Sequence, residues 1–225
     1  MPGPECSVPT VVLPGSRDPR DRDRAIRPGA RGYEREEIVT LQRARLIDAV
    51  VQVVAEDGYE QAGVRAIAER AGVGLNTFYE HFDSKQTLCL LAYDEGVAVL
   101  FGAVTNAFSA GTGRPWRDRI ESALTALLGG LAENPNFARY FFVEIHKVGN
   151  EGQERAFEAF AAAFSMFERV EPVASDTIPA RELLPLVVGG IYSRLYFYIA
   201  TGQTDRLPLL VPVLTEFAVA TFGPI

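Results

Sequence analysis

The fold is decided by residues 64–82, which read VRAIAERAGVGLNTFYEHF. Apolar residues recur at helical spacing on both sides of Gly72, so the pattern predicts one short helix before this glycine and another beginning near Leu75. Helices that meet steeply need a small side chain where they cross, here Ala68, and a turn residue that accepts a positive φ, here Gly72. The stretch is therefore predicted to be a helix-turn-helix.

The same periodicity predicts helices outward from this motif. An amphipathic helix precedes it from about residue 36 and stops at Asp57-Gly58, and Ser84 caps a long helix that follows it to about residue 110. Breakers such as Asn134-Pro135 and Gly202 separate the remaining helices, which we expect over residues 116–133, 137–148, 152–170, 180–201 and 204–221. No segment alternates as a strand does, so the expected fold class is all-α.

Composition divides the chain into three expected regions. Residues 1–32 are rich in Pro, Gly, Arg and Asp and are expected to form a disordered arm, although a misassigned start codon would also explain them. Residues 33–83 are expected to form the helix-turn-helix domain. Residues 84–225 are expected to form a helical bundle.

The charge balance restricts the partners. The 225 residues hold 22 Lys plus Arg against 29 Asp plus Glu, and residues 1–85 alone hold 12 against 14, so bulk positive charge cannot hold a nucleic acid. No unbroken apolar run reaches the roughly 18 residues of a membrane span, and only two cysteines are present, so we expect a cytoplasmic protein without membrane contact. With only His81 and His146, we expect no metal, no cofactor and no catalytic residues.

The second helix of the motif has an unusual exposed face. Asn76 can pair bidentately with adenine, Thr77 and Tyr79 carry hydroxyls, and His81 and Lys85 lie at its flank. Such a helix can place its first residues at base edges in a major groove while hydroxyl and cationic groups contact phosphates. The alternative is a helical hairpin with a purely structural role.

Residues 40–90 resemble the TetR/AcrR family of transcriptional regulators. The resemblance is carried by Arg45 to Ala49, Gly58-Tyr59, Val64 to Val73, Thr77-Phe78-Tyr79, His81-Phe82, Ser84-Lys85 and Leu88. It implies phosphate contacts from Thr77, Tyr79, His81 and Lys85 and base-edge contacts from the start of the recognition helix, here Leu75 and Asn76. Arg65 either contacts phosphate or only solvates its helix.

Two glycines depart from the family pattern. Gly63 and Gly74 stand where relatives often have Thr and Ser before the two helices. Glycine is an acceptable N-cap, so the fold is expected to survive. The phosphate contacts that those hydroxyls make in relatives are lost.

Residues 115–200 are unusually rich in aromatic side chains. Aromatic stripes at helical spacing often form a core, but the resemblance implies a ligand cavity within the bundle. The candidate ligand contacts are Trp116, Phe137, Tyr140, Phe141, Glu144, Phe160, Phe164, Tyr192 and Tyr196. We expect a small, hydrophobic and partly aromatic effector, for which Glu144 either supplies a polar anchor or faces solvent.

The last two predicted helices carry more apolar surface than one side of a surface helix needs, and Gly189-Gly190 would allow a close helix approach. In the family such a pair forms an interface with its copy, so we expect a homodimer on a pseudo-palindromic operator, released by the ligand. Repressor action is favoured and activator action stays open. The rivals are a ligand-binding scaffold with a vestigial motif and an enzyme using Glu144 with His146, whose i, i+2 spacing separates them on a helix.

Overall fold

The computed structural model describes residues 11–21, 35–168 and 180–222. Within these ranges every regular element is helical, which confirms the all-α class. The α-helices are α1 (Arg35–Asp57), α2 (Val64–Ala71), α3 (Leu75–His81), α4 (Lys85–Ala110), α5 (Trp116–Glu133), α6 (Pro135–Arg139), α7 (Asn150–Glu168), α8 (Ala180–Ala200) and α9 (Val211–Phe222). Short helical turns are η2 (Tyr140–Glu144), η3 (Ile145–Lys147) and η4 (Thr204–Leu210).

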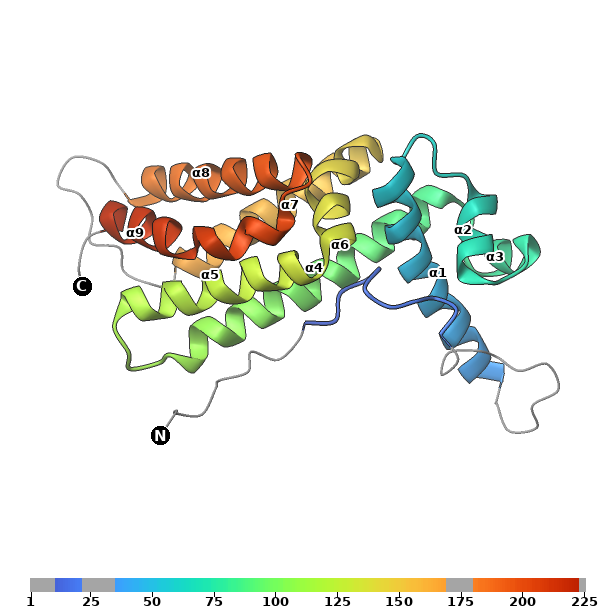
Figure 1. Ribbon diagram of the computed structural model, residues 1–225, viewed down its shortest axis with the longest axis horizontal. Helices are drawn as coiled ribbons and strands as arrows, with labels where there is room; N and C mark the ends of the chain where they lie inside the picture. Colours follow the sequence, from blue (N-terminus) through green and yellow to red (C-terminus); the bar gives the residue numbers. More distant parts are fainter. Residues whose placement is uncertain (1–10, 22–34, 169–179, 223–225) are drawn as a thin grey trace.

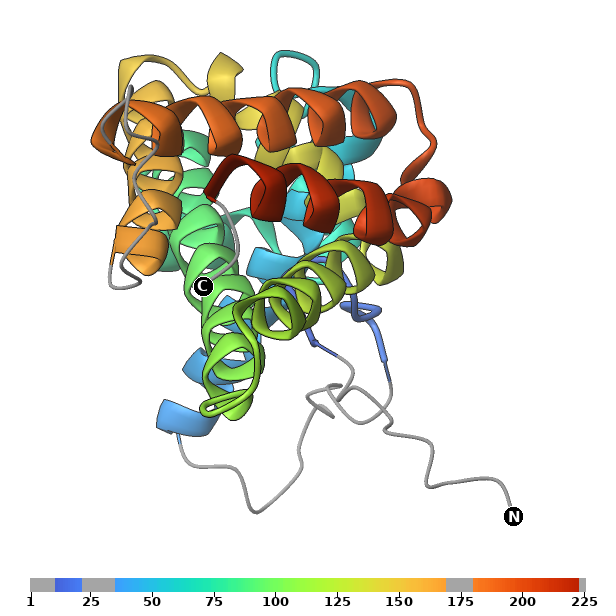
Figure 2. The ribbon, with the colours of Figure 1, turned by 90° about the vertical axis from the view of Figure 1, so that its left-hand side faces the viewer.

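The molecule has a three-helix head and a helical bundle. Figure 1 shows the head, α1 to α3, at one end of the long axis, with α4 running from it into the bundle formed by α5 to α9. Helix α1 packs on α2 inside the head and on α4, α6 and η2 of the bundle. Seen along the long axis, α8 and α9 lie side by side on the end of the bundle that is remote from α3 (Figure 2).

The turn of the head follows the sequence prediction. Helix α2 ends at Gly72 with φ +64°, and the Val73 N–H donates to the Ala68 carbonyl at 3.0 Å. This positive φ favours glycine, and a Cβ here would also displace the end of the Arg45 side chain, whose guanidinium nitrogen lies 2.4 Å from the Cβ position. Ala68 and Phe78 are buried in the angle between the helices. The helix-turn-helix is confirmed.

Two predicted helices are each divided. The segment expected as one helix over residues 137–148 becomes α6, the π-helical turn η2 and the 3-10 turn η3, and the Ile145 N–H reaches the Tyr140 carbonyl five residues back. The segment expected over residues 204–221 divides into η4 and α9, because Pro208 has no N–H to continue an α-helical ladder. The link expected over residues 171–179 lies outside the described residues.

Residues 11–21, named here the N-terminal strap, lie against α1. Leu13 is 1% exposed, and the Gly15 N–H donates to Asp48 Oδ1 at 2.7 Å. Gly15 has φ +85°, and a Cβ there would lie 2.5 Å from Val51 Cγ1. Gln52 Nε2 donates to the Gly15 carbonyl at 3.1 Å. The expectation of a disordered arm is therefore wrong for residues 11–21, because one buried leucine and backbone hydrogen bonds dock a segment whose composition is polar.

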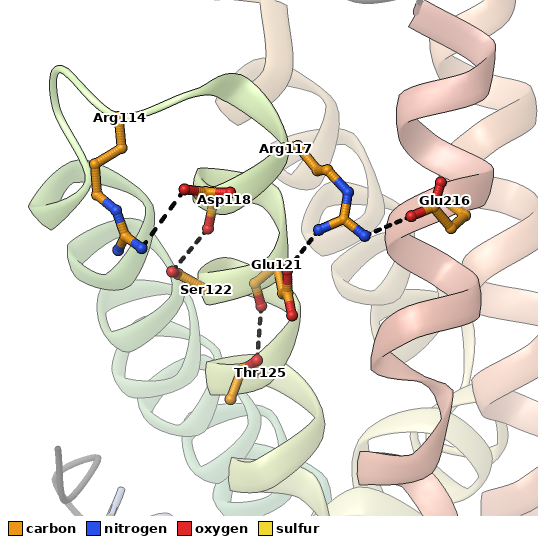
Figure 3. A network of polar contacts seen from close by, with 7 residues as sticks. All are labelled: Arg114, Arg117, Asp118, Glu121, Ser122, Thr125 and Glu216. Carbon is orange, nitrogen blue, oxygen red and sulfur yellow. Dashed lines mark hydrogen bonds and ion pairs between the residues drawn. The ribbon is translucent and has the colours of Figure 1, made fainter. Parts of the chain in front are cut away.

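An exposed ion-pair network joins α5 to α9 (Figure 3). Arg117 donates to Glu121 on its own helix at 3.0 Å and to Glu216 of α9. One turn earlier, Arg114 lies 3.6 Å from Asp118. Exposed pairs of this kind contribute at most about 1 kcal/mol each. The network therefore orients α9 on α5 more than it holds the fold together.

Two described helical segments, α4 and residues 182–200 of α8, are long and apolar enough to cross a membrane by length and composition alone. The buried core helices of water-soluble proteins meet the same criterion. Helix α4 packs on α1, α5 and α7, and Asp94 and Glu95 interrupt its apolar run. These contacts give α4 the role of the bundle's central helix.

Candidate DNA-contacting surface and ligand cavity

The exposed face of α3 carries three of the predicted DNA contacts. Leu75 is 39% exposed and Tyr79 is 54% exposed, and Asn76, the residue after Leu75, is also exposed. Phe78, fully buried, anchors the opposite face, and its ring meets the Tyr79 ring edge to face at 5.3 Å. Arg65 is exposed on α2 of the same head. The helix thus presents its first turn and one tyrosine to solvent while its core residue fixes its position.

His81 is half-buried at the end of α3. Its Nε2 lies 2.8 Å from Gln42 Oε1 of α1. Burial, followed by the neighbouring charge of Arg43, lowers the pKa of His81. Burial therefore favours the neutral imidazole, whose Nε2 shares a hydrogen bond with the Gln42 amide.

Lys85 is held by the loop between α1 and α2. Its Nζ donates to the Tyr59 carbonyl at 2.6 Å and lies 4.1 Å from the centre of the Tyr59 ring. Thr77 is half-buried in the first turn of α3. Gly63 and Gly74 occupy the N-cap positions of α2 and α3 without a side-chain hydrogen bond, as expected from the sequence.

Other cations of the head are engaged inside it. Arg70 forms an ion pair with Glu56 at 2.6 Å, and this hydrogen bond raises the pKa of Arg70 and lowers that of Glu56. Arg43 lies 4.8 Å from the centre of the Phe82 ring. The head therefore offers a nucleic acid a few placed groups and not a broad positive surface.

An apolar cavity of about 100 Å³ lies inside the bundle. It is lined by α4, α5, η2, α7 and α8, and the only residues with a polar side-chain group in its described lining are Tyr93 and Tyr192. The lining residues are Tyr93, Leu100, Phe101, Val104, Ala123, Leu124, Leu127, Phe141, Phe142, Ala156, Ala159, Phe160, Ala163, Val188, Ile191, Tyr192 and Leu195. Of the predicted ligand contacts, Phe141, Phe160 and Tyr192 lie in this wall.

Five predicted ligand contacts lie outside the wall, contrary to the sequence interpretation: Trp116, Phe137, Tyr140, Glu144 and Tyr196. Phe137 instead packs on α4 where a glycine, Gly96, leaves room for its ring. Tyr140 is buried, and its hydroxyl donates to the Cys89 carbonyl. The Trp116 ring packs edge to face on Phe108, and Tyr196 is 40% exposed. The side chain of the remaining candidate, Phe164, lies outside the described residues.

The wall residues that sequence reasoning missed include every one on α4 and α5. Tyr93 stacks on Phe141 with ring centres 5.1 Å apart, and Leu100 and Val104 continue the wall along α4. Their helical spacing is that of ordinary core residues. The same spacing serves a core and a cavity wall, so the sequence held no signal that separates the two.

Glu144 lies at the junction of bundle and head. Its side chain is fully buried and accepts the Tyr59 N–H at 3.0 Å, with Lys147 Nζ at 3.0 Å and Arg139 Nη2 at 3.3 Å as ion-pair partners. His146 bonds elsewhere, with its Nε2 2.9 Å from the Tyr192 hydroxyl. Glu144 and His146 thus have separate partners, which is the arrangement expected for groups that do not act together as acid and base.

The chemistry of the bundle offers little else that reacts. Burial raises the pKa of the Cys89 thiol to about 12, so this cysteine stays protonated at neutral pH. Across residues 11–21, 35–168 and 180–222, no three His, Cys, Asp or Glu side chains gather into a group that could hold a metal ion.

Comparison with known proteins shows which family the head resembles. Residues 46–92 match the family model described as "Bacterial regulatory proteins, tetR family". Residues 46–92 belong to the TetR family. TetR-family proteins are transcriptional regulators and not enzymes. The matched segment contains the whole helix-turn-helix and the start of α4.

Curated TetR-family relatives align with the amino-terminal half. The chain is 32% identical over 101 residues to the transcriptional activator FasR of Mycolicibacterium smegmatis, which is 45% of each protein. It is 32% identical over 94 residues to the transcriptional repressor KstR of the same species, covering 42% of this chain and 45% of KstR. The chain thus matches less than half the length of these relatives.

The fold of the whole chain has a counterpart among solved structures. FadR of Bacillus subtilis, solved in complex with stearoyl-CoA, superposes with a TM-score of 0.67 at 20% identity. The superposition covers 82% of this chain and all of that one. The shared fold therefore extends beyond the head into the bundle.

Proposed function

We propose that this protein is a ligand-responsive transcriptional repressor that binds a pseudo-palindromic operator as a homodimer and is released by a small apolar ligand. In this proposal residues 33–83 bind DNA and residues 84–225 bind the ligand and the second copy. One observation carries it: a single chain combines an outward-facing recognition helix with an apolar cavity in the attached bundle.

In the proposed complex the first turn of α3 enters the major groove. Leu75 and Asn76 contact base edges there, while Thr77, Tyr79, His81, Lys85 and Arg65 contact phosphates. Replacing Asn76 with Ala is expected to relax the base preference at one position of each half-site, costing about 1–3 kcal/mol for the preferred base. Replacing Arg65 with Ala should weaken binding to all sequences and make the salt dependence less steep.

The exposed apolar side chains of the remote end support a dimer. Large apolar residues of α8, η4 and α9 are 42–72% exposed: Leu186, Phe197, Leu209, Val213 and Phe217. A two-fold interface over this surface would pair α8 and α9 with their copies. Gly190 also meets its own Phe217, since a Cβ there would lie 3.2 Å from that ring. A Val213→Glu variant is expected to sediment as a monomer, and a wild-type monomer at micromolar concentration would refute the dimer.

The cavity favours a long apolar ligand, and an acyl chain is the proposed class. Support comes from the apolar walls and from the structural relative FadR, which was solved with stearoyl-CoA. The cavity of about 100 Å³ is smaller than the roughly 300–1,000 Å³ of typical ligand pockets, so a ligand must displace wall side chains. Such a ligand binds the bundle with displaced wall side chains more tightly than the ligand-free bundle. This difference in affinity between two conformations is the requirement for allosteric release.

The test is selection of bound sequences from random duplex DNA, followed by titration of the complex with stearoyl-CoA. We expect a two-fold related pair of half-sites about 34–36 Å, or a multiple of that, apart. Stearoyl-CoA should release the DNA. A reporter gene behind the selected sequence then distinguishes repression from activation, the action named for FasR. Absence of any enriched sequence would contradict DNA binding and favour a scaffold role.

A further inference from the structure

We propose that Glu144 is a positioning residue that transmits a change in the cavity wall to the head through the backbone of Tyr59. The inference rests on the proposed release by an apolar ligand. The contacts of this buried carboxylate toward the cavity and toward the head both support the proposed role.

The cavity side of this link is the π-helical turn η2. Phe141 and Phe142, both in the cavity wall, share this five-residue turn with Glu144. The Phe141 ring stacks on Tyr93, and the Phe142 ring packs at a tilt against Tyr192, each with ring centres 5.1 Å apart. A ligand that pushes these rings outward therefore acts on the turn that carries Glu144.

The head side is a single residue, Tyr59, whose backbone N–H and C=O are both hydrogen-bonded. The Tyr59 N–H donates to Glu144 at 3.0 Å, and the Tyr59 carbonyl accepts from Lys85 at 2.6 Å. Tyr59 lies in the loop that joins α1 to α2, directly before the helix-turn-helix. Lys85 is itself a proposed phosphate contact. A shift of Glu144 would thus alter both the loop and a cation of the DNA-contacting surface.

The charges around Glu144 allow this contact to break. Its cationic partners Arg139 and Lys147 belong to the bundle and are 40% and 45% exposed. They move with the carboxylate, so losing Tyr59 does not leave a buried charge unpaired, the situation that is strongly destabilising. The Tyr59 N–H is only partly buried and can exchange its partner for water.

The geometry of η2 also suits a movable element. Its closing hydrogen bond runs from the Ile145 N–H to the Tyr140 carbonyl, five residues apart instead of four. Single π-helical turns inside helical segments occur frequently at functional sites. Tyr140 is fixed on α4 by its bond to the Cys89 carbonyl, so movement is expected at the Glu144 end.

The experiment compares full-length wild type with Glu144→Ala, Glu144→Gln and the exposed control Glu154→Ala. Amide hydrogen exchange is followed for residues 58–62 with and without stearoyl-CoA, and binding of stearoyl-CoA is measured by calorimetry. In wild type, saturation with stearoyl-CoA should speed exchange in this loop about tenfold. Glu144→Ala should exchange at the faster rate without ligand and show no further increase, although it still binds stearoyl-CoA.

The remaining variants separate positioning from folding. Glu144→Gln keeps an acceptor for the Tyr59 N–H and should recover protection and most of the ligand response, and Glu154→Ala should behave as wild type. Glu144→Ala with wild-type exchange in residues 58–62, or with an unchanged ligand response there, would overturn the link. Failure of wild type to bind stearoyl-CoA would count against the proposed ligand, and the ligand-free comparison of Glu144→Ala with wild type would still decide whether Glu144 holds the loop.

Discussion

Replacing Leu13 with Ala tests whether the N-terminal strap is part of the folded protein. Leu13 is 1% exposed, and the substitution removes three carbon atoms at about 0.8 kcal/mol each, or about 2.4 kcal/mol. The space left behind raises the expected loss to about 2.5–4 kcal/mol. The free energy of docking the strap sets an upper limit to this loss. A larger loss would detach the strap and break the hydrogen bonds that join Gly15 to Asp48 and Gln52.

The assay is urea unfolding together with limited trypsin digestion. Val12→Ala is the matched control, since Val12 is 43% exposed and its truncation should change stability by at most about 0.5 kcal/mol. Trypsin should cleave after the exposed Arg17 at least about tenfold faster in Leu13→Ala than in Val12→Ala, because cleavage follows the population of the undocked strap. Equal unfolding midpoints and equal cleavage rates for the two variants would show that the strap is not docked.

Three further predictions concern the head and its support. Gly96→Ala should lower the free energy of unfolding by about 1–3 kcal/mol, because its Cβ would lie 2.0 Å from the Phe137 ring. Thermal unfolding measures this change. A variant as stable as wild type would show that the Phe137 ring can move aside. Gly63→Thr should tighten operator binding, because it places a hydroxyl at the N-cap of α2, where a Cβ meets no atom within 4 Å. The free energy of unfolding should change by only a few tenths of a kcal/mol. Binding titrations that show no gain in affinity would indicate that this N-cap does not contact a phosphate. His81 has a lowered pKa in the folded protein, so its contribution to stability is present above the unfolded value of about 6.5 and is lost as the pH falls. A phosphate contact in the DNA complex would raise the pKa of His81 again. Operator affinity should therefore increase as the pH falls below 6.5, by up to about tenfold for each unit by which this pKa rises. In binding titrations at several pH values, His81→Gln should abolish this pH dependence.

The head was predictable from sequence because its determinants are local. Ala68 and Gly72 lie four residues apart and fix the crossing and the turn, and Phe78 follows at helical spacing. The exposed face of α3 followed from the same register. The bundle differs because its determinants are distant in sequence: Phe137 is a core residue only because Gly96 faces it from α4.

Glu144 and Leu13 show two other ways in which the pattern fails. In η2, four of five consecutive residues are buried, and the wider turn leaves no 3.6-residue stripe from which a buried carboxylate could be recognised. Leu13 stands in a polar segment where one apolar residue makes no period, and its burial depends on a positive φ at Gly15 and on Asp48 of α1. In each case a distant partner takes part: Tyr59 is 85 residues from Glu144, and Asp48, which anchors the strap beside Leu13, is 33 residues from Gly15.

A head with few available cations depends on geometry for its affinity. Residues 1–85 carry a net charge of -2, and Arg70 and Arg43 are engaged internally, so in the proposed complex DNA binding relies on several placed contacts made at once by two heads. The hydrogen bond from Tyr59 to Glu144 contributes about 1 kcal/mol in each protomer. In the proposed dimer its loss would amount to about 2 kcal/mol, or roughly thirtyfold in operator affinity, which lies within the usual range of allosteric coupling. One hydrogen bond per subunit would therefore supply a coupling of the usual size in the proposed repressor.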